Sequence, residues 1–79
     1  MRNLVEVIQQ ILDIIPEDRT EIISILKDNK TSVEIAPPEM IPFWWKEIHK
    51  NLTDYIFNKE FYYESWRETV RKIWTDEKV

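Results

Sequence analysis

The chain has 79 residues and a formal net charge of -4, with one histidine and neither cysteine nor glycine. A chain this short forms one domain with a small core, and its composition excludes a disulfide framework and a metal site built from His and Cys. The acidity disfavours binding to nucleic acid or to anionic lipid, and the lack of glycine excludes a glycine-rich phosphate loop.

The two halves of the chain differ in apolar side chains and in charge. All ten aromatic residues lie at or after Phe43, whereas the apolar positions before it are almost entirely Ile, Leu and Val. Residues 1–42 hold four basic and eight acidic side chains, and residues 43–79 hold seven of each. We therefore expect two helical units within a single domain that spans residues 1–79.

The first half predicts an aliphatic helical hairpin over residues 1–29. Apolar residues from Leu4 to Ile15 cover nearly half of a helical wheel, and Pro16 should end this helix. Asp18 and Glu21 have the spacing of a capping box, which predicts that a second helix begins there and ends near Asn29.

Residues 30–40 are expected to form a connector between the two units. Val33 and Ile35 flank a polar residue, which leaves a short strand or an extended coil open. Pro37 and Pro38 should stiffen this segment into an extended path.

The second half predicts an aromatic-rich hairpin over residues 41–75. One helix should occupy residues 41–58, with Pro42 in its first turn, and another should begin near Asn58 and end near Thr75. Salt bridges from Glu64 to Arg67 and along Glu68 should support the last helix. The expected fold is therefore all-α, a small four-helix arrangement of two helical hairpins joined by a Pro-rich extended connector.

No catalytic, cofactor or metal site follows from the sequence. His49 has no second ligand one helical turn away, and the carboxylates of Glu60, Glu64 and Glu68 stand beside basic partners. A nucleophile elbow requires glycine, which the chain lacks. We therefore expect no enzyme activity and infer no small-molecule substrate.

Surplus apolar helix surface predicts a non-catalytic protein–protein interaction or assembly module. The broad face of the first helix exceeds what short neighbours should cover, so it favours self-association, as a homodimer, or docking to a larger protein. Tryptophan concentrates in interface hot spots, and the phenylalanines lie off the apolar stripes. The interface candidates are Val7, Ile11, Ile14, Phe43, Trp44, Trp45, Phe57 and Phe61.

An alternative is a small acidic inhibitor or decoy that binds a basic nucleic-acid-handling enzyme. Its acidic surface would comprise Glu17, Asp18 and Glu21. Polar residues interrupt the apolar stretch after Arg2, and no apolar run is long enough to span a membrane, so a cytoplasmic protein is expected.

Overall fold

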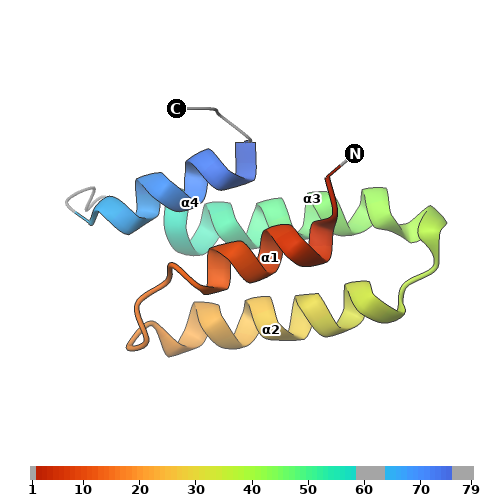
Figure 1. Ribbon diagram of the computed structural model, residues 1–79, viewed down its shortest axis with the longest axis horizontal. Helices are drawn as coiled ribbons and strands as arrows, with labels where there is room; N and C mark the ends of the chain where they lie inside the picture. Colours follow the sequence, from red (N-terminus) through yellow and green to blue (C-terminus); the bar gives the residue numbers. More distant parts are fainter. Residues whose placement is uncertain (1, 59–63, 76–79) are drawn as a thin grey trace.

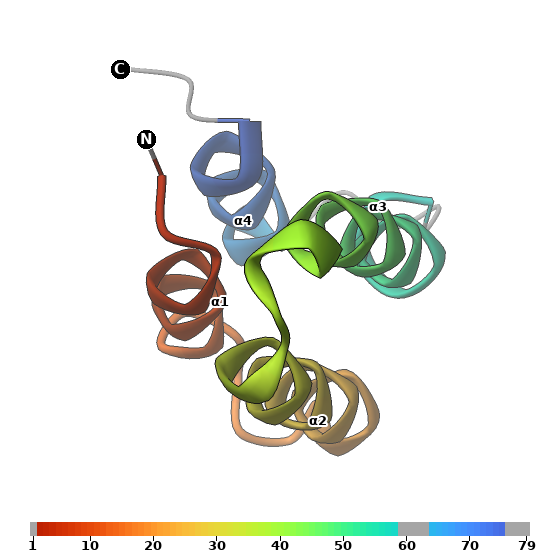
Figure 2. The ribbon, with the colours of Figure 1, turned by 90° about the vertical axis from the view of Figure 1, so that its right-hand side faces the viewer.

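The computed structural model describes residues 2–58 and 64–75, and within them the chain is helical apart from short connections. The elements are α1 (Leu4–Leu12), α2 (Thr20–Ile35), the 3-10 turn η1 (Pro38–Met40), α3 (Ile41–Leu52), the π-helical turn η2 (Thr53–Phe57) and α4 (Ser65–Thr75). Helix α1 packs against α2 and α4, and α2 also packs against α3 (Figure 1). Viewed from its end, the bundle has the four helices around one centre (Figure 2). The predicted all-α, four-helix class is confirmed.

Helix α1 begins with a side-chain cap and buries an aliphatic face. The Asn3 side-chain oxygen accepts a hydrogen bond from the Glu6 backbone N–H at 3.2 Å, which satisfies one of the orphan donors at the helix start. The residues of α1 that are buried are Leu4, Val7, Ile8 and Ile11. Because α2 and α4 both pack against this helix, its wide apolar face is covered from two sides within one copy.

The connection from α1 to α2 departs from the predicted capping box. Helix α1 ends at Leu12, four residues before Pro16, and α2 begins at Thr20 without a side-chain cap. Asp18 forms an ion pair with Arg19 at 3.5 Å, and the Glu21 carboxylate lies beside the Tyr55 hydroxyl. Each carboxylate thus has a partner other than the backbone N–H that the box requires, and the prediction is wrong.

Helix α2 continues to Ile35, so the predicted connector over residues 30–40 is mostly helix. Asn29 lies within the helix, and its side-chain oxygen accepts a hydrogen bond from the Asn51 amide on α3 at 3.0 Å. Val33 is buried in the core. Burial of an apolar side chain one turn beyond Asn29 stabilises the added helix, which outweighs the modest helix propensity of this stretch.

A proline sets the end of α2. Ala36 has an extended backbone, with φ of -73° and ψ of 142°, because the ring of Pro37 disfavours helical geometry in the preceding residue. The turn η1 follows at once with Pro38 at its start, and it leads directly into α3. The extended connector is therefore reduced to Ala36 and Pro37.

The predicted third helix is present as α3 followed by η2. The last turn widens to π geometry, in which the Asn58 N–H donates to the Thr53 carbonyl at 2.9 Å. Helix α4 is described from Ser65 onward, so the predicted start of the fourth helix at Asn58 lies partly outside the described residues.

One hydrophobic core joins all four helices. Its fully buried large side chains each contribute about 1.5–3 kcal/mol relative to exposure. They are Ile8, Ile11, Leu26, Ile48, Leu52, Ile56 and Val70. Among the described residues, no helix has the length and apolar character needed to cross a membrane.

Truncation of Ile11 on α1 and of Ile14 in the turn that follows should separate a core position from one at the edge of the core. Ile11 is fully buried and Ile14 is partly buried. We expect Ile11→Ala to lower the free energy of unfolding by about 2–5 kcal/mol, because it leaves a cavity in the core. Ile14→Ala should cost clearly less. Urea unfolding followed by circular dichroism measures both, and a larger loss for Ile14→Ala would contradict this packing.

Candidate functional site

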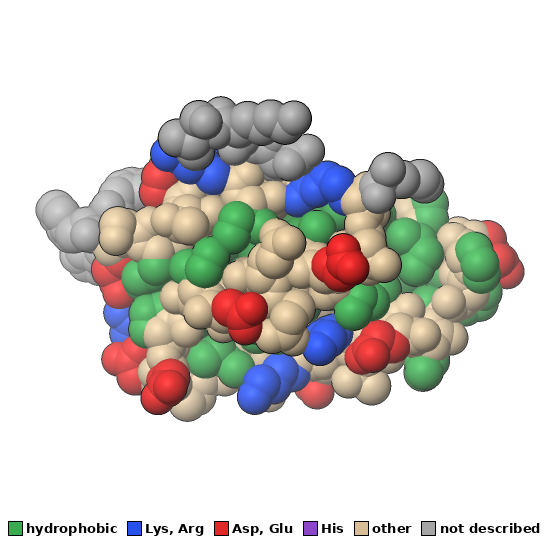
Figure 3. All heavy atoms as spheres, viewed as in Figure 1, with side chains coloured by type: hydrophobic (Ala, Val, Ile, Leu, Met, Phe, Trp, Pro, Cys, Tyr) green, Lys and Arg blue, Asp and Glu red, His purple; other side chains and the backbone are tan. Residues whose placement is uncertain are grey.

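Exposed apolar side chains gather where α2 turns into α3. Ile35 is 82% exposed, Phe43 48% and Met40 40%. The exposed prolines of the same turn extend this surface. We call it the α2–α3 tip and define it as Ile35, Pro37, Pro38, Met40, Pro42 and Phe43. In Figure 3, hydrophobic side chains collect at the right-hand end, over this connection.

The tip has little backbone freedom, although it lies at the surface. Pro37, Pro38 and Pro42 have their φ angles fixed by the pyrrolidine ring. The Met40 N–H donates to the Pro37 carbonyl at 2.9 Å, which closes the 3-10 turn. A surface that is already ordered loses less conformational entropy when a partner covers it.

Aromatic packing holds Phe43 on the bundle. Its ring meets that of Trp44 edge to face, with centroids 5.3 Å apart at 80°. Trp44 is half-buried against the core, so the pair links the exposed ring to the interior. Edge-to-face pairs contribute about 0.5–1.5 kcal/mol beyond the area they bury.

Trp45 starts a second aromatic contact, between α3 and α4. Its ring centroid lies 5.0 Å from that of the buried Trp74, and the Arg2 guanidinium lies 5.5 Å from the Trp45 ring. Arg2 also donates hydrogen bonds to the backbone carbonyls of Ile73 and Trp74. A cation at the last carbonyls of a helix interacts favourably with the helix dipole, so Arg2 ties the start of the chain to the end of α4.

His49 lies at the edge of this aromatic cluster. Its Nδ1 atom accepts a hydrogen bond from the Trp74 indole N–H at 2.9 Å, and the two rings stack at 17°. The hydrogen bond satisfies an indole donor that burial would otherwise leave without water. Nothing in this arrangement gives His49 a second ligand or a nucleophile to activate. Within residues 2–58 and 64–75, no group of three His, Cys, Asp or Glu side chains could hold a metal ion.

The opposite end of the bundle carries a charge network centred on Glu64. Its carboxylate accepts hydrogen bonds from the Trp66 indole N–H at 2.9 Å, from Arg19 and from Arg67. These donors stabilise the ionised form, Trp66 most strongly, and lower the pKa of Glu64 from 4.5 to about 2. The predicted ion pairs from Glu64 to Arg67 and from Glu68 to Arg71 are both present.

Arg67 connects this network to the π-helical turn. Its side chain is only 13% exposed, and Nη1 donates to the carbonyls of Tyr55 and Ile56, each at 3.3 Å. A π turn disturbs the regular backbone ladder, and the guanidinium supplies donors to carbonyls at that point. The irregular end of α3 is therefore held by a side chain from α4.

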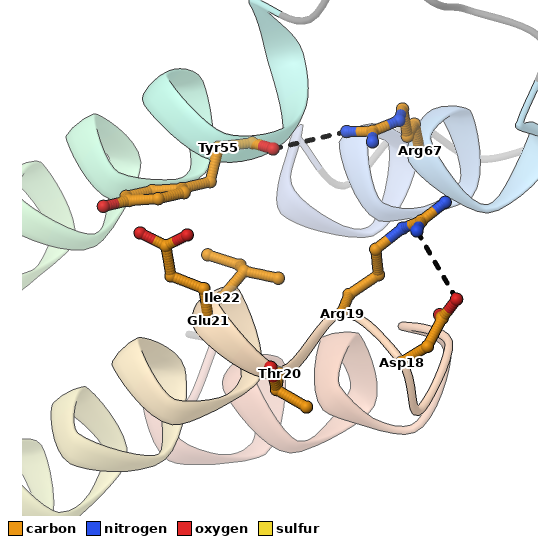
Figure 4. A pocket seen from close by; sticks show the side chains of 7 residues that line it. All are labelled: Asp18, Arg19, Thr20, Glu21, Ile22, Tyr55 and Arg67. Carbon is orange, nitrogen blue, oxygen red and sulfur yellow. Dashed lines mark hydrogen bonds and ion pairs between the residues drawn. The ribbon is translucent and has the colours of Figure 1, made fainter.

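A cleft of about 640 Å³ opens beside Arg67. It is lined by Asp18, Arg19, Thr20, Glu21, Ile22, Tyr55 and Arg67 (Figure 4). In the figure the Tyr55 hydroxyl points at the Glu21 carboxylate, and this interaction raises the pKa of Tyr55. The four ionised side chains of the lining are two acids and two bases, and each has a described partner. The charged side chains of the cleft thus connect elements of the fold, and the cleft does not resemble a ligand site.

The structure separates the predicted interface residues by depth. Val7 is 5% exposed and Ile11 is fully buried, so both lie in the core of one copy and offer no surface to a partner in this arrangement. Partly buried positions are Ile14, Trp44, Trp45 and Phe57, and Phe43 is exposed. Phe61 lies outside the described residues.

The predicted acidic surface is also divided by its contacts. Glu17 is exposed, but Asp18 is paired with Arg19 and Glu21 with Tyr55. Two of the three carboxylates therefore stabilise the α1–α2 connection and the joint with η2. Of the three carboxylates in the predicted acidic surface, only Glu17 has no such contact with the described residues.

Sequence reasoning missed Ile35 and Met40. Both were assigned to the connector, so their surface was not considered. A signal was available for Ile35: the buried residues of α2 are Ile22, Leu26 and Val33, and Ile35 lies two positions beyond Val33, which places it on another side of the helix. The same reasoning had identified the phenylalanines, which lie off the apolar stripes of their helices.

Comparison of the chain with protein-family models, with curated proteins and with solved structures finds no match. Function is therefore argued from the site alone.

Stability should depend on pH through Glu64. Its folded-state pKa of about 2 lies below the reference value of 4.5, so the ionised carboxylate stabilises the fold above about pH 4.5. This contribution should fall as the pH drops through the folded-state pKa. We expect the stability difference between wild type and Glu64→Gln to be constant near neutrality and to shrink toward pH 2.

Chemical denaturation across this pH range measures that difference. Glu68→Gln serves as a control, because Glu68 also has a lowered pKa but belongs to an exposed pair with Arg71. A Glu64→Gln difference that does not change with pH would contradict the assigned network.

Proposed function

We propose that the chain is a non-catalytic protein-interaction module and that the α2–α3 tip is its docking surface. The observation that carries this proposal is the exposure of Ile35, Met40 and Phe43 together, within nine residues at one end of the bundle. Scattered exposed apolar residues need no explanation, but a contiguous group on an ordered turn is typical of interaction sites.

The position of the tip supports docking over a role in stability. The core closes without these side chains, since its buried members lie on the inner faces of the helices. The exposed side chains of the tip contribute little to folding, yet three prolines and Trp44 hold the tip in place. These side chains are therefore suited to contact with another molecule. Aromatic and methionine side chains are both enriched at such contacts.

Self-association through α1, as the sequence favoured, has less support than the tip. The centre of the α1 face is already covered by α2 and α4, and its partly accessible apolar residues are Val5 and Leu12, with Ile14 in the turn that follows. A second copy could still associate through the tip. That outcome belongs to the same proposal, because the tip would again be the contact surface.

Polar substitution of the tip should remove binding without unfolding the bundle. We expect Ile35→Ser to change the free energy of unfolding by less than about 1 kcal/mol, because this side chain is 82% exposed. Phe43→Ser should cost more, because it also removes the edge-to-face pair with Trp44. Leu26→Ser, at a fully buried position, should destabilise strongly. Thermal and urea unfolding provide the comparison, and a large loss for Ile35→Ser would show that the tip stabilises the fold.

Site-specific photocrosslinking tests the proposed contact. One variant carries a benzophenone side chain in place of Phe43. A matched control carries it in place of Glu17, just before the N-terminal end of α2 and away from the tip. Crosslinked products are identified from the cells that make this chain, and each candidate is purified and bound in isolation. The proposal predicts a product at position 43 whose purified form binds wild type at least about tenfold more tightly than Ile35→Ser. Equal products at both positions would contradict it.

A further inference from the structure

The chain segment that forms most of the tip carries only acidic side chains. Residues 31–45 contain Glu34 and Glu39 and no Lys, Arg or His. Both glutamates are exposed, and each immediately precedes an exposed apolar residue of the tip, Ile35 or Met40. In the face shown in Figure 3, the Lys and Arg side chains lie away from the right-hand end.

Basic residues lie on either side of this segment. Lys30, on α2, donates to the side-chain oxygen of Gln9 at 2.8 Å, which directs it toward α1. Lys46 is exposed and follows Phe43 by one helical turn, so it adds a basic side chain on the α3 side of the tip. The negative border of the tip therefore lies along the end of α2 and along η1, at Glu34 and Glu39.

This border disfavours a second copy as the occupant. A two-fold symmetric contact places the same patch on both sides, so the carboxylates of Glu34 and Glu39 would face a tip that carries the same charges. Like charges brought together at a partly desolvated contact weaken association. An anionic membrane surface is disfavoured for the same reason.

We propose that the tip binds a cationic amphipathic segment of another protein, a deduction that rests on the docking function proposed above. Apolar side chains of the segment cover Ile35, Met40 and Phe43. Lysine or arginine side chains at its edges reach Glu34 and Glu39. Apolar burial supplies affinity, and the carboxylates select for positive charge and raise the rate of association.

Defined peptides test the charge preference directly. The probe is a synthetic amphipathic helix of leucine and lysine, about 18 residues long, or five turns at 3.6 residues per turn. Its twin has every lysine replaced by glutamate. Isothermal titration calorimetry at low salt should show binding of the lysine peptide and none of the glutamate twin.

Matched charge variants assign this preference to the tip. Glu34→Gln combined with Glu39→Gln should weaken binding of the lysine peptide about three- to tenfold, and the effect should fade at high salt. Glu17→Gln combined with Asp28→Asn removes the same charge from exposed positions away from the tip, and it should change affinity less than twofold, about the scatter expected for distant sites. Ile35→Ser should weaken binding about tenfold.

Several results would overturn the proposal. Equal weakening by the two charge pairs would mean that net charge alone attracts the peptide. Equal binding of the twin, no binding of the lysine peptide, or insensitivity to Ile35→Ser would each exclude a cationic partner at the tip.

A second copy is distinguished by sedimentation of the chain alone. A dimer that Ile35→Ser dissociates would overturn the cationic partner but leave the docking role of the tip intact. By contrast, equal photocrosslinking at positions 43 and 17 would remove the docking role itself. The two proposals therefore fail on different results.

Discussion

The aliphatic face of α1 is the contact on which the rest of the structure depends. Helix α1 is the element that packs against both α2 and α4, and its buried side chains lie at the centre of the one core. A chain of this length has little apolar surface to spare, so coverage of α1 from two sides is what closes the bundle. Once the bundle is closed, apolar side chains that remain exposed are available for contact with other molecules.

The two ends of the bundle handle their irregular backbone differently. At the η2 end, Arg67 donates to backbone carbonyls while Glu64 gathers donors from three residues. At the α2–α3 end, prolines fix the turn and apolar side chains face solvent. Side chains from several elements bind one another at the first end, whereas the apolar side chains at the second end are exposed. This difference supports assigning interaction to the tip.

The helices could be predicted from periodicity, but several of their ends could not. The apolar spacing predicted α1, although this helix ends at Leu12 and not at Pro16. Pro37 ends α2, but the extension of α2 beyond Asn29 depended on burial of Val33, a tertiary contact. The capping box is absent because α2 begins at Thr20 without a side-chain cap, and Glu21 instead lies beside Tyr55, which is distant in sequence. Local patterns therefore predicted which helices form, and tertiary contacts decided how far α2 extends.

The candidate site was predictable in part for the same reason. Phe43 was identified from its off-stripe position, but Ile35 was hidden by the wrong end of α2. Val7 and Ile11 were expected at an interface because a helical wheel shows the width of an apolar face and not the number of neighbours that cover it. That number follows from tertiary packing, here with α2 and α4.

Carbene footprinting of the purified chain, read residue by residue, tests whether α2 and α4 cover the apolar face of α1 within one copy. The reagent labels side chains in proportion to their accessibility. For the monomeric chain we expect strong labelling of Ile35, Met40 and Phe43 and almost none of Val7 or Ile11. Heavy labelling of Val7 and Ile11 with a protected tip would show that α1 is open in one copy and would contradict the account.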